Sequence, residues 1–238
     1  GRFNHEAVAL DPNTGIVYLT EDRHDGLLYR FIPTKKNDLH SGGKLQALAI
    51  KNGPKFDTRN WPDTIGPDIQ PNVPMNLEWI ELEDVEAPED DLRFRGHEKG
   101  AALFARGEGM WYDEGVIYFA CTSGGDLQKG QVFKLTPDPN NVDGGELELF
   151  IEPNNTDIMK YCDNLTVAPW GDVMLCEDDT DAYLRGVTPE GKIFTFGHST
   201  KHQSEFTGIC YSPSGKTMFV NIQHAGLTLA ITGPWKSA

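Results

Sequence analysis

The stretch at residues 162–178, CDNLTVAPWGDVMLCED, places three carboxylates around one predicted β-hairpin. Its first half alternates apolar and polar residues, its second half is apolar, and a Pro-Trp-Gly-Asp turn joins the two, which is typical of paired strands. Asp163 opens the first strand, and Glu177 with Asp178 closes the second. All three acids therefore lie at the open end of the hairpin. Such an end could hold a cation, or it could be an ordinary solvated hairpin end.

The same pattern of acid, strand, turn and apolar strand recurs in the chain, at residues 6–22, 108–123 and 206–223. When the copies are aligned on their turns, three of them have an acid at the same first position: Glu6, Glu108 and Asp163. In the fourth copy Thr207 takes this position, and Glu205 lies two residues earlier. Repetition makes a shared role for the acids more plausible than a single hairpin would.

Each copy continues into a third predicted strand, and three copies continue into a fourth. Four-stranded units of roughly 45 residues are the signature of β-propeller blades. The sequence therefore predicts an all-β fold, a β-propeller of about four to six four-stranded blades, with at least one blade expected on the N-terminal side of residue 1. The alternative is a repetitive β-sandwich.

We interpret residues 1–238 as a single propeller domain with a long insertion at about 51–99 that is rich in Pro, Asp and Glu. A loop of this length is usually functional or mobile. The insertion could be a lid over the channel mouth, an arm that binds a partner, or a blade whose strands are hard to recognise.

In a propeller the first strand of each blade lines the central channel, so Glu6, Glu108 and Asp163 are expected to converge at one mouth. Each pair of carboxylates at about 4 Å repels by roughly 4 kcal/mol at an effective dielectric constant near 20. Protons or cations must offset this repulsion. Because oxygen-only clusters suit hard ions, calcium is the expected cation, with iron or manganese as alternatives. The competing interpretation is a set of salt-bridged or solvated acids.

Several further residues are candidates for the same site. The acids at other hairpin ends are secondary candidates for metal ligands: Glu21, Glu177, Asp178 and Glu205. Arg106, two residues before Glu108, has the geometry to grip a phosphate through two parallel hydrogen bonds, or it could pair with a neighbouring acid. Asn164 could add an amide oxygen, and His5 and His224 could be ligands, proton shuttles or structural residues.

Composition excludes several classes of partner. The formal net charge of −15 argues against binding to nucleic acid or to an anionic membrane. No apolar run reaches the length of a membrane span.

The four cysteines (Cys121, Cys162, Cys176 and Cys210) form no CxxC pair and no zinc-binding spacing, so we expect buried free thiols. There is no Ser-His-Asp arrangement, P-loop or dinucleotide fingerprint.

Four motifs together resemble the PhoX-type alkaline phosphatases, over residues 1 to about 235: GRFNHE at 1–6, FARGEG at 104–109, CDNLTVAPWGD at 162–172 and EFTGICYSPSGKTMFVNIQHAG at 205–226. The resemblance implies a β-propeller with a calcium and iron site that hydrolyses phosphate monoesters after export to the periplasm or beyond. It implies metal ligation by Glu6, Glu108 and Asp163, and phosphate contact by Arg106. The family's cysteine iron ligand belongs to a segment upstream of GRF, so the resemblance implies calcium more directly than iron and gives Cys176 no such role.

The function expected from these observations is metal-dependent hydrolysis of a small-molecule phosphate ester by a monomeric protein. One alternative is a calcium-dependent lactonase, because the stretch SPSGKTMFV at 212–220 resembles hairpins of gluconolactonase-type propellers. Another alternative is a non-catalytic propeller in which calcium only stabilises the ring.

Overall fold

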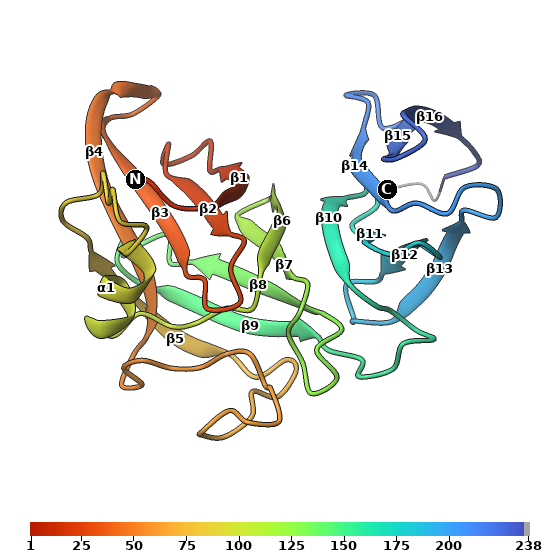
Figure 1. The fold of residues 1–238 in the computed structure, drawn as a ribbon. Helices are drawn as coiled ribbons and strands as arrows, with labels where there is room; N and C mark the ends of the chain where they lie inside the picture. The colour runs from red at the N-terminus through yellow and green to blue at the C-terminus, as the bar shows by residue number, and fades with distance from the viewer. Residues whose placement is uncertain (236–238) are drawn as a thin grey trace.

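Four antiparallel β-meanders follow one another along the chain in a computed structural model that describes residues 1–235. Figure 1 shows them side by side around an arc, in chain order. The first blade comprises β1 (His5–Leu10), β2 (Val17–Glu21), β3 (Leu28–Lys35) and β4 (Asp38–Ile50). The second comprises β6 (Gly107–Asp113), β7 (Val116–Cys121), β8 (Gln131–Pro137) and β9 (Gly145–Ile151). The third comprises β10 (Cys162–Val167), β11 (Val173–Glu177), β12 (Tyr183–Val187) and β13 (Ile193–His198). The fourth has three strands, β14 (Phe206–Tyr211), β15 (Thr217–Ile222) and β16 (Leu227–Thr232).

The first strands of successive blades are neighbours, since β6 contacts both β1 and β10, and β10 contacts β14. In a β-sandwich, consecutive meanders would pack face to face as two layers. Here the strand order and the arc of blades identify an all-β propeller, so the predicted fold class is confirmed. The described residues account for four blades, at the lower end of the predicted four to six.

The apolar core lies between the blades. Three phenylalanines, Phe104, Phe119 and Phe133, pack with ring centroids 5.3–5.5 Å apart between the first two blades. A second cluster around Leu165 fills the space between blades two and three, and a third around Met218 lies between blades three and four. Each blade is therefore stabilised by its neighbour rather than by a core of its own.

Residues 51–99 do not form a separate blade. Their one strand, β5 (Met75–Glu81), pairs with the outer strands of both the first and second blades, β4 and β9. This pairing joins the two blades into a single nine-stranded sheet. The short helix α1 (Leu92–Glu98) buries Leu92 in a cluster with Leu27, Tyr29 and Leu45 on the side of the first blade. Within the segment, β5 thus lies along both blades and α1 along the first (Figure 1).

All four cysteines are free, and Cys121, Cys162 and Cys176 are buried, as predicted for packing residues. Among the described residues, no helix is long and apolar enough to cross a membrane.

Neighbouring first strands approach closely at Gly109. A Cβ built on this glycine would lie 2.6 Å from both the Asn164 Cα and the Asp163 carbonyl oxygen, which are backbone atoms that cannot turn aside. Gly109→Ala should therefore destabilise the protein by about 1–3 kcal/mol through overpacking. Chemical denaturation measures the effect. The matched control is Gly197→Ala in β13, where the nearest atom would be 3.7 Å away and where we expect less than about 0.5 kcal/mol. Equal destabilisation of the two variants would contradict the close approach.

Candidate metal centre

The strand register places Glu6, Glu108 and Asp163 at equivalent positions. In each of the first three blades, the residue before the acid pairs with the last residue of the second strand. These pairs are His5 with Glu21, Gly107 with Cys121, and Cys162 with Glu177. The register shifts immediately afterwards in all three blades. Such a β-bulge bends the strand and re-aims its side chains. Each acid therefore sits in a bulge at the start of a channel-lining strand.

A backbone hydrogen bond repeated in all four blades defines two further positions beside each acid. In each blade, the amide of the residue that follows the second strand donates to the carbonyl of the residue two before the aligned position, which is Glu6, Glu108, Asp163 or Thr207. The four bonds are 2.9–3.1 Å long and run from Asp22 to Asn4, Thr122 to Arg106, Asp178 to Tyr161 and Gln223 to Glu205. Three positions per blade thus face one mouth of the channel. All the charged side chains at these positions are Glu6, Asp22, Arg106, Glu108, Asp163, Asp178 and Glu205, and we call these seven residues the mouth cluster.

One half of the mouth cluster is made of carboxylates from the third and fourth blades. Single carboxylate oxygens of Asp163, Asp178 and Glu205 all lie within 4.8 Å of one another, and all three residues are partly buried. This spacing is compatible with three oxygens around one ion of calcium's size, since ligands at 2.3–2.6 Å from an ion lie at most about 5 Å apart.

The other half surrounds Arg106. Its guanidinium donates from Nε to Asp22 Oδ1 at 2.7 Å and from Nη2 to Glu108 Oε1 at 2.7 Å. Arg106 has a left-handed backbone with φ of 52°, a conformation that costs a non-glycine residue about 1–3 kcal/mol and is concentrated at functional sites. The ion pair expected as the alternative to a phosphate contact is therefore present. Asp22 and Glu108 together hold the guanidinium in a fixed plane.

Burial and neighbouring acids raise the pKa of four carboxyl groups in the mouth cluster. Burial, followed by the charges of Asp163, Asp22 and Glu6, raises the pKa of Glu108 to about 9. Burial and Asp178 raise the pKa of Asp163 to about 6, and burial and Asp178 likewise raise that of Glu205 to about 7. Glu6 is also shifted upward, chiefly by burial and by Asp22. Six carboxylates therefore share one field with a single guanidinium, and the site favours protons or cations.

The donor set indicates which cations would fit. Every potential ligand in the mouth cluster is a carboxylate oxygen, with no imidazole or thiolate among the seven residues. Hard cations such as calcium prefer this chemistry. Among the described residues, Asp163, Asp178 and Glu205 have the spacing to hold one such cation.

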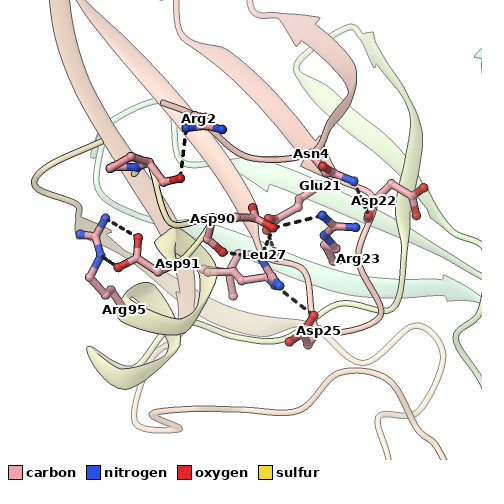
Figure 2. A network of polar contacts seen from close by, with 12 residues as sticks. Arg2, Asn4, Glu21, Asp22, Arg23, Asp25, Leu27, Asp90, Asp91 and Arg95 are labelled. Atoms are coloured by element: carbon pink, nitrogen blue, oxygen red, sulfur yellow. Dashed lines mark hydrogen bonds and ion pairs between the residues drawn. The ribbon is translucent and has the colours of Figure 1, made fainter. Parts of the chain in front are cut away.

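Glu21 and Glu177, which the sequence suggested as secondary ligands, lie outside the mouth cluster. Both are completely buried and bind the start of the third strand of their own blade. Glu21 accepts from the Leu27 amide at 3.1 Å and from the Tyr29 hydroxyl at 2.8 Å. Figure 2 shows Glu21 turned toward Leu27, with Asp22 pointing the other way. Glu177 is bound by the Tyr183 amide and by Arg185 Nε at 2.8 Å.

Three other candidate residues are occupied by local contacts. Asn164 Oδ1 accepts from the Ile209 amide at 2.8 Å and so ties β10 to β14. The His224 ring contacts the Ser204 hydroxyl at 3.1 Å. His5 stacks on Phe3 and contacts the Gly1 carbonyl at 2.8 Å. None of these contacts points to a ligand, and they fit the structural reading of the two histidines.

Asp22 is the residue of the mouth cluster that the sequence analysis missed. It follows Glu21 as Asp178 follows Glu177, and both aspartates are positioned by the repeated backbone hydrogen bond. The signal was present, because the pairs Glu21-Asp22 and Glu177-Asp178 align. A β-strand turns alternate residues to opposite faces, so only one acid of each pair can reach the channel mouth.

Residues 57–61 of segment 51–99 are anchored to the loop after β7. The Thr58 amide donates to the Leu103 carbonyl, and the amide of Gly125, in the loop after β7, donates to the Arg59 carbonyl. The Arg59 guanidinium lies 4.2 Å from the centre of the Trp61 ring. Trp61 Nε1 donates to the Ser123 carbonyl at 2.6 Å. Ser123 follows Thr122, whose amide donates to the Arg106 carbonyl at 3.0 Å, so residues 57–61 are linked to Arg106 through the backbone of residues 122–125.

The neighbours Glu177 and Asp178 should respond differently to removal of charge. Glu177→Gln leaves Arg185 buried without its partner, which costs about 3–5 kcal/mol, whereas Asp178→Asn relieves repulsion and should leave the metal-free protein at least as stable. Calcium titration should show the reverse order, with Asp178→Asn lowering affinity at least ten-fold and Glu177→Gln less than three-fold. Unfolding curves in chelator and calorimetric titration measure the two effects. The same response in both variants would refute the division of roles.

The metal-free protein should lose stability as pH rises from about 5 to about 9. Unfolded carboxyl groups release their protons near pH 4, whereas the folded protein retains them on Asp163, Glu205 and Glu108 up to pH values of about 6, 7 and 9. Because the native state binds more protons in this window, its stability falls as pH rises. Melting temperatures in chelator at pH 5, 7 and 9 measure the slope, and millimolar calcium at pH 8 should restore stability. Glu108→Gln should flatten the slope, and an increase in melting temperature across the window would contradict this account.

A family model described as alkaline phosphatase PhoX matches residues 1–226. No curated protein sequence matches. The structure of Pseudomonas fluorescens PhoX in complex with vanadate, described as a transition state analogue, superposes with a TM-score of 0.72 at 21% identity, covering 94% of this chain and 49% of that chain.

Two further structures superpose less well. A Lactobacillus plantarum protein gives a TM-score of 0.41 at 12% identity, covering 94% of this chain and 54% of that one. The structure of a putative 6-phosphogluconolactonase from Bacteroides uniformis gives a TM-score of 0.40 at 11% identity, covering 94% of this chain and 69% of that one. These values are too low to carry an argument about function.

The chain spans about half the length of the Pseudomonas fluorescens PhoX structure that it matches. The family match, in contrast, extends over nearly all of this sequence and includes every residue of the mouth cluster. The chain belongs to the alkaline phosphatase PhoX family.

Proposed function

We propose that this protein is a metal-dependent phosphomonoesterase that acts on a small-molecule phosphate ester at the mouth cluster. The observation that carries the proposal is the position of Arg106, a fixed guanidinium within a group of six carboxylates. A cation-filled carboxylate site beside a guanidinium suits a phosphate ester, because both the metal ions and the arginine attract its anionic oxygens. The family match supports phosphatase-type chemistry.

The residues that would hold metal fall into two groups. Asp163, Asp178 and Glu205 have the spacing for one cation, and the three acids nearest Arg106 would hold others: Glu6, Asp22 and Glu108. Calcium fits these oxygen donors best, and iron is a further possibility implied by the family resemblance. Bound ions would polarise the phosphoryl oxygens and lower the pKa of a bound water.

Arg106 would bind and orient the phosphate. Its Nε and Nη2 are held by Asp22 and Glu108, which leaves Nη1 without a partner among residues 1–235. A donor fixed in this way needs no reorganisation when negative charge develops on the phosphoryl group, so its interaction is strongest at the transition state. The two acids thereby act as positioning residues for the guanidinium as well as candidate ligands.

Two further elements of the proposal concern the protein's setting. We propose that it is exported to the periplasm or beyond, in line with the family, and acts as a monomer. Cell fractionation would test the location, and light scattering would test the oligomeric state. Activity confined to the cytoplasmic fraction would contradict the first.

Removal of the guanidinium tests the phosphate-binding role. Arg106→Ala should lower kcat/KM for p-nitrophenyl phosphate by about 10²–10³-fold, the loss usual for one transition-state donor. Arg106→Lys should recover only part of this loss, because an ammonium cannot maintain the planar contacts to Asp22 and Glu108. Arg95→Ala is the control, because Arg95 makes a comparable ion pair with Asp91 on α1 outside the mouth cluster. An active Arg106→Ala variant would remove the main support for the proposal.

Removal of metal tests whether hydrolysis depends on bound cations. Elemental analysis of the purified protein should find calcium, chelation should abolish p-nitrophenyl phosphate hydrolysis, and Asp163→Asn should lower both metal content and activity. Hydrolysis of a lactone but not of the phosphate ester would instead indicate the lactonase alternative. Calcium-dependent melting without either activity would indicate a structural role for the ion.

A further inference from the structure

The first strands that carry the mouth cluster also line a second feature at their opposite ends. A hollow of about 530 Å³ lies across the second, third and fourth blades. Its walls include Trp111 on β6, Trp170 in the turn after β10, and Tyr211 at the end of β14. We call this feature the aromatic cleft. It shares no residue with the mouth cluster and is not used by the proposed phosphatase function.

The aromatic walls are held in fixed positions. Trp170 Nε1 donates to Asp172 Oδ2 at 2.7 Å, and the Trp170 ring meets Tyr211 edge-on with centroids 5.6 Å apart. The Trp170 ring also stacks on the Trp235 ring, with the two ring centroids 5.6 Å apart. Trp111, in contrast, is 37% exposed, which leaves its indole accessible from the cleft. The cleft thus combines a rigid aromatic wall with an accessible indole.

Two hydroxyl groups in the lining have no hydrogen-bond partner among residues 1–235. Thr166 is completely buried and its Oγ1 is unpartnered, and the Tyr211 hydroxyl oxygen is likewise buried without a partner among the described residues. A buried hydroxyl left unpaired is unfavourable. Their presence in the lining of one cleft gives a polar ligand two groups to bind.

The charge of the lining is of one sign. Asp113 and Glu114 are its ionisable acids, and none of the described residues that line the cleft is Lys, Arg or His. Acids without a balancing base attract cations and repel anions such as phosphate esters. Aromatic faces add to this selectivity, because their negative quadrupole binds ammonium groups.

We propose that the aromatic cleft binds an organic ammonium ion that carries at least one N–H group. The indole of Trp111 would contact the cation and its apolar substituent, and Asp113 and Glu114 would neutralise its charge. Thr166 Oγ1 and the Tyr211 hydroxyl would accept hydrogen bonds from the ammonium. A cleft of this volume has room for an aromatic or branched amine.

Three ligands of the same shape and different charge test the proposal: benzylammonium, benzyl alcohol and benzoate. Calorimetric titration of the purified protein should show saturable binding of benzylammonium, at least ten-fold tighter than benzyl alcohol, and no binding of benzoate. Equal affinity for the cation and the alcohol would overturn the proposal, as would failure of benzylammonium to saturate.

Variants assign the binding to this cleft. Trp111→Ala and Asp113→Asn should each weaken benzylammonium binding at least five-fold, and Thr166→Val, which keeps the side chain's shape, should weaken it measurably. Two exposed positions outside the cleft serve as matched controls, Phe94→Ala for the aromatic ring and Glu146→Gln for the acid, and neither should change the affinity. Binding that is unaffected by Trp111→Ala and Asp113→Asn would place the ammonium elsewhere and refute the assignment. Because these measurements use no phosphate ester, they are independent of the phosphatase proposal.

Discussion

Repulsion among carboxylates is the physical constraint on which the channel mouth depends. Six acids from four blades meet around one guanidinium, and the pKa of Glu108 rises to about 9 as a result of burial and of its acidic neighbours. A fold selected for stability alone would not gather so many like charges, because each close pair costs several kcal/mol. This repulsion is the reason that we propose a cation site here, in which bound metal would offset the charge of the carboxylates.

The backbone imposes this arrangement through repetition. In every blade the same hydrogen bond ties the residue after the second strand to the residue that lies two before the aligned position. A bulge follows at the acid in each of the first three blades. The left-handed backbone at Arg106 and at its counterpart Tyr161 shows that strain is tolerated at this position in two successive blades. Glu6, Glu108 and Asp163 lie within strands, and the other three acids each lie directly beside a strand end. Their positions are thus fixed by regular structure, which suits a site that must resist its own repulsion.

Much of the charge surrounding the site has a supporting role. Glu21 and Glu177 satisfy the first amides of the third strands, and each is followed by an aspartate of the mouth cluster. The network beside Glu21, which includes Arg23, Asp25 and Asp90, supports the loop that follows β2 (Figure 2). The acidic composition of the chain thus combines two kinds of carboxylate, those that hold the blades together and those that face the channel. Net charge alone could not distinguish them.

The sequence by itself determined the propeller, the alignment of Glu6, Glu108 and Asp163, and the proximity of Arg106 to Glu108, because these follow from strand periodicity and from a repeat. Only the tertiary structure decided which acid of each closing pair faces the channel, since the neighbours Glu21 and Asp22 differ by half a strand period and composition cannot show the face. It also decided that β5 joins two blades and that Trp111, Thr166 and Tyr211 line one cleft. Those contacts are between residues distant in the chain, and no local pattern encodes them.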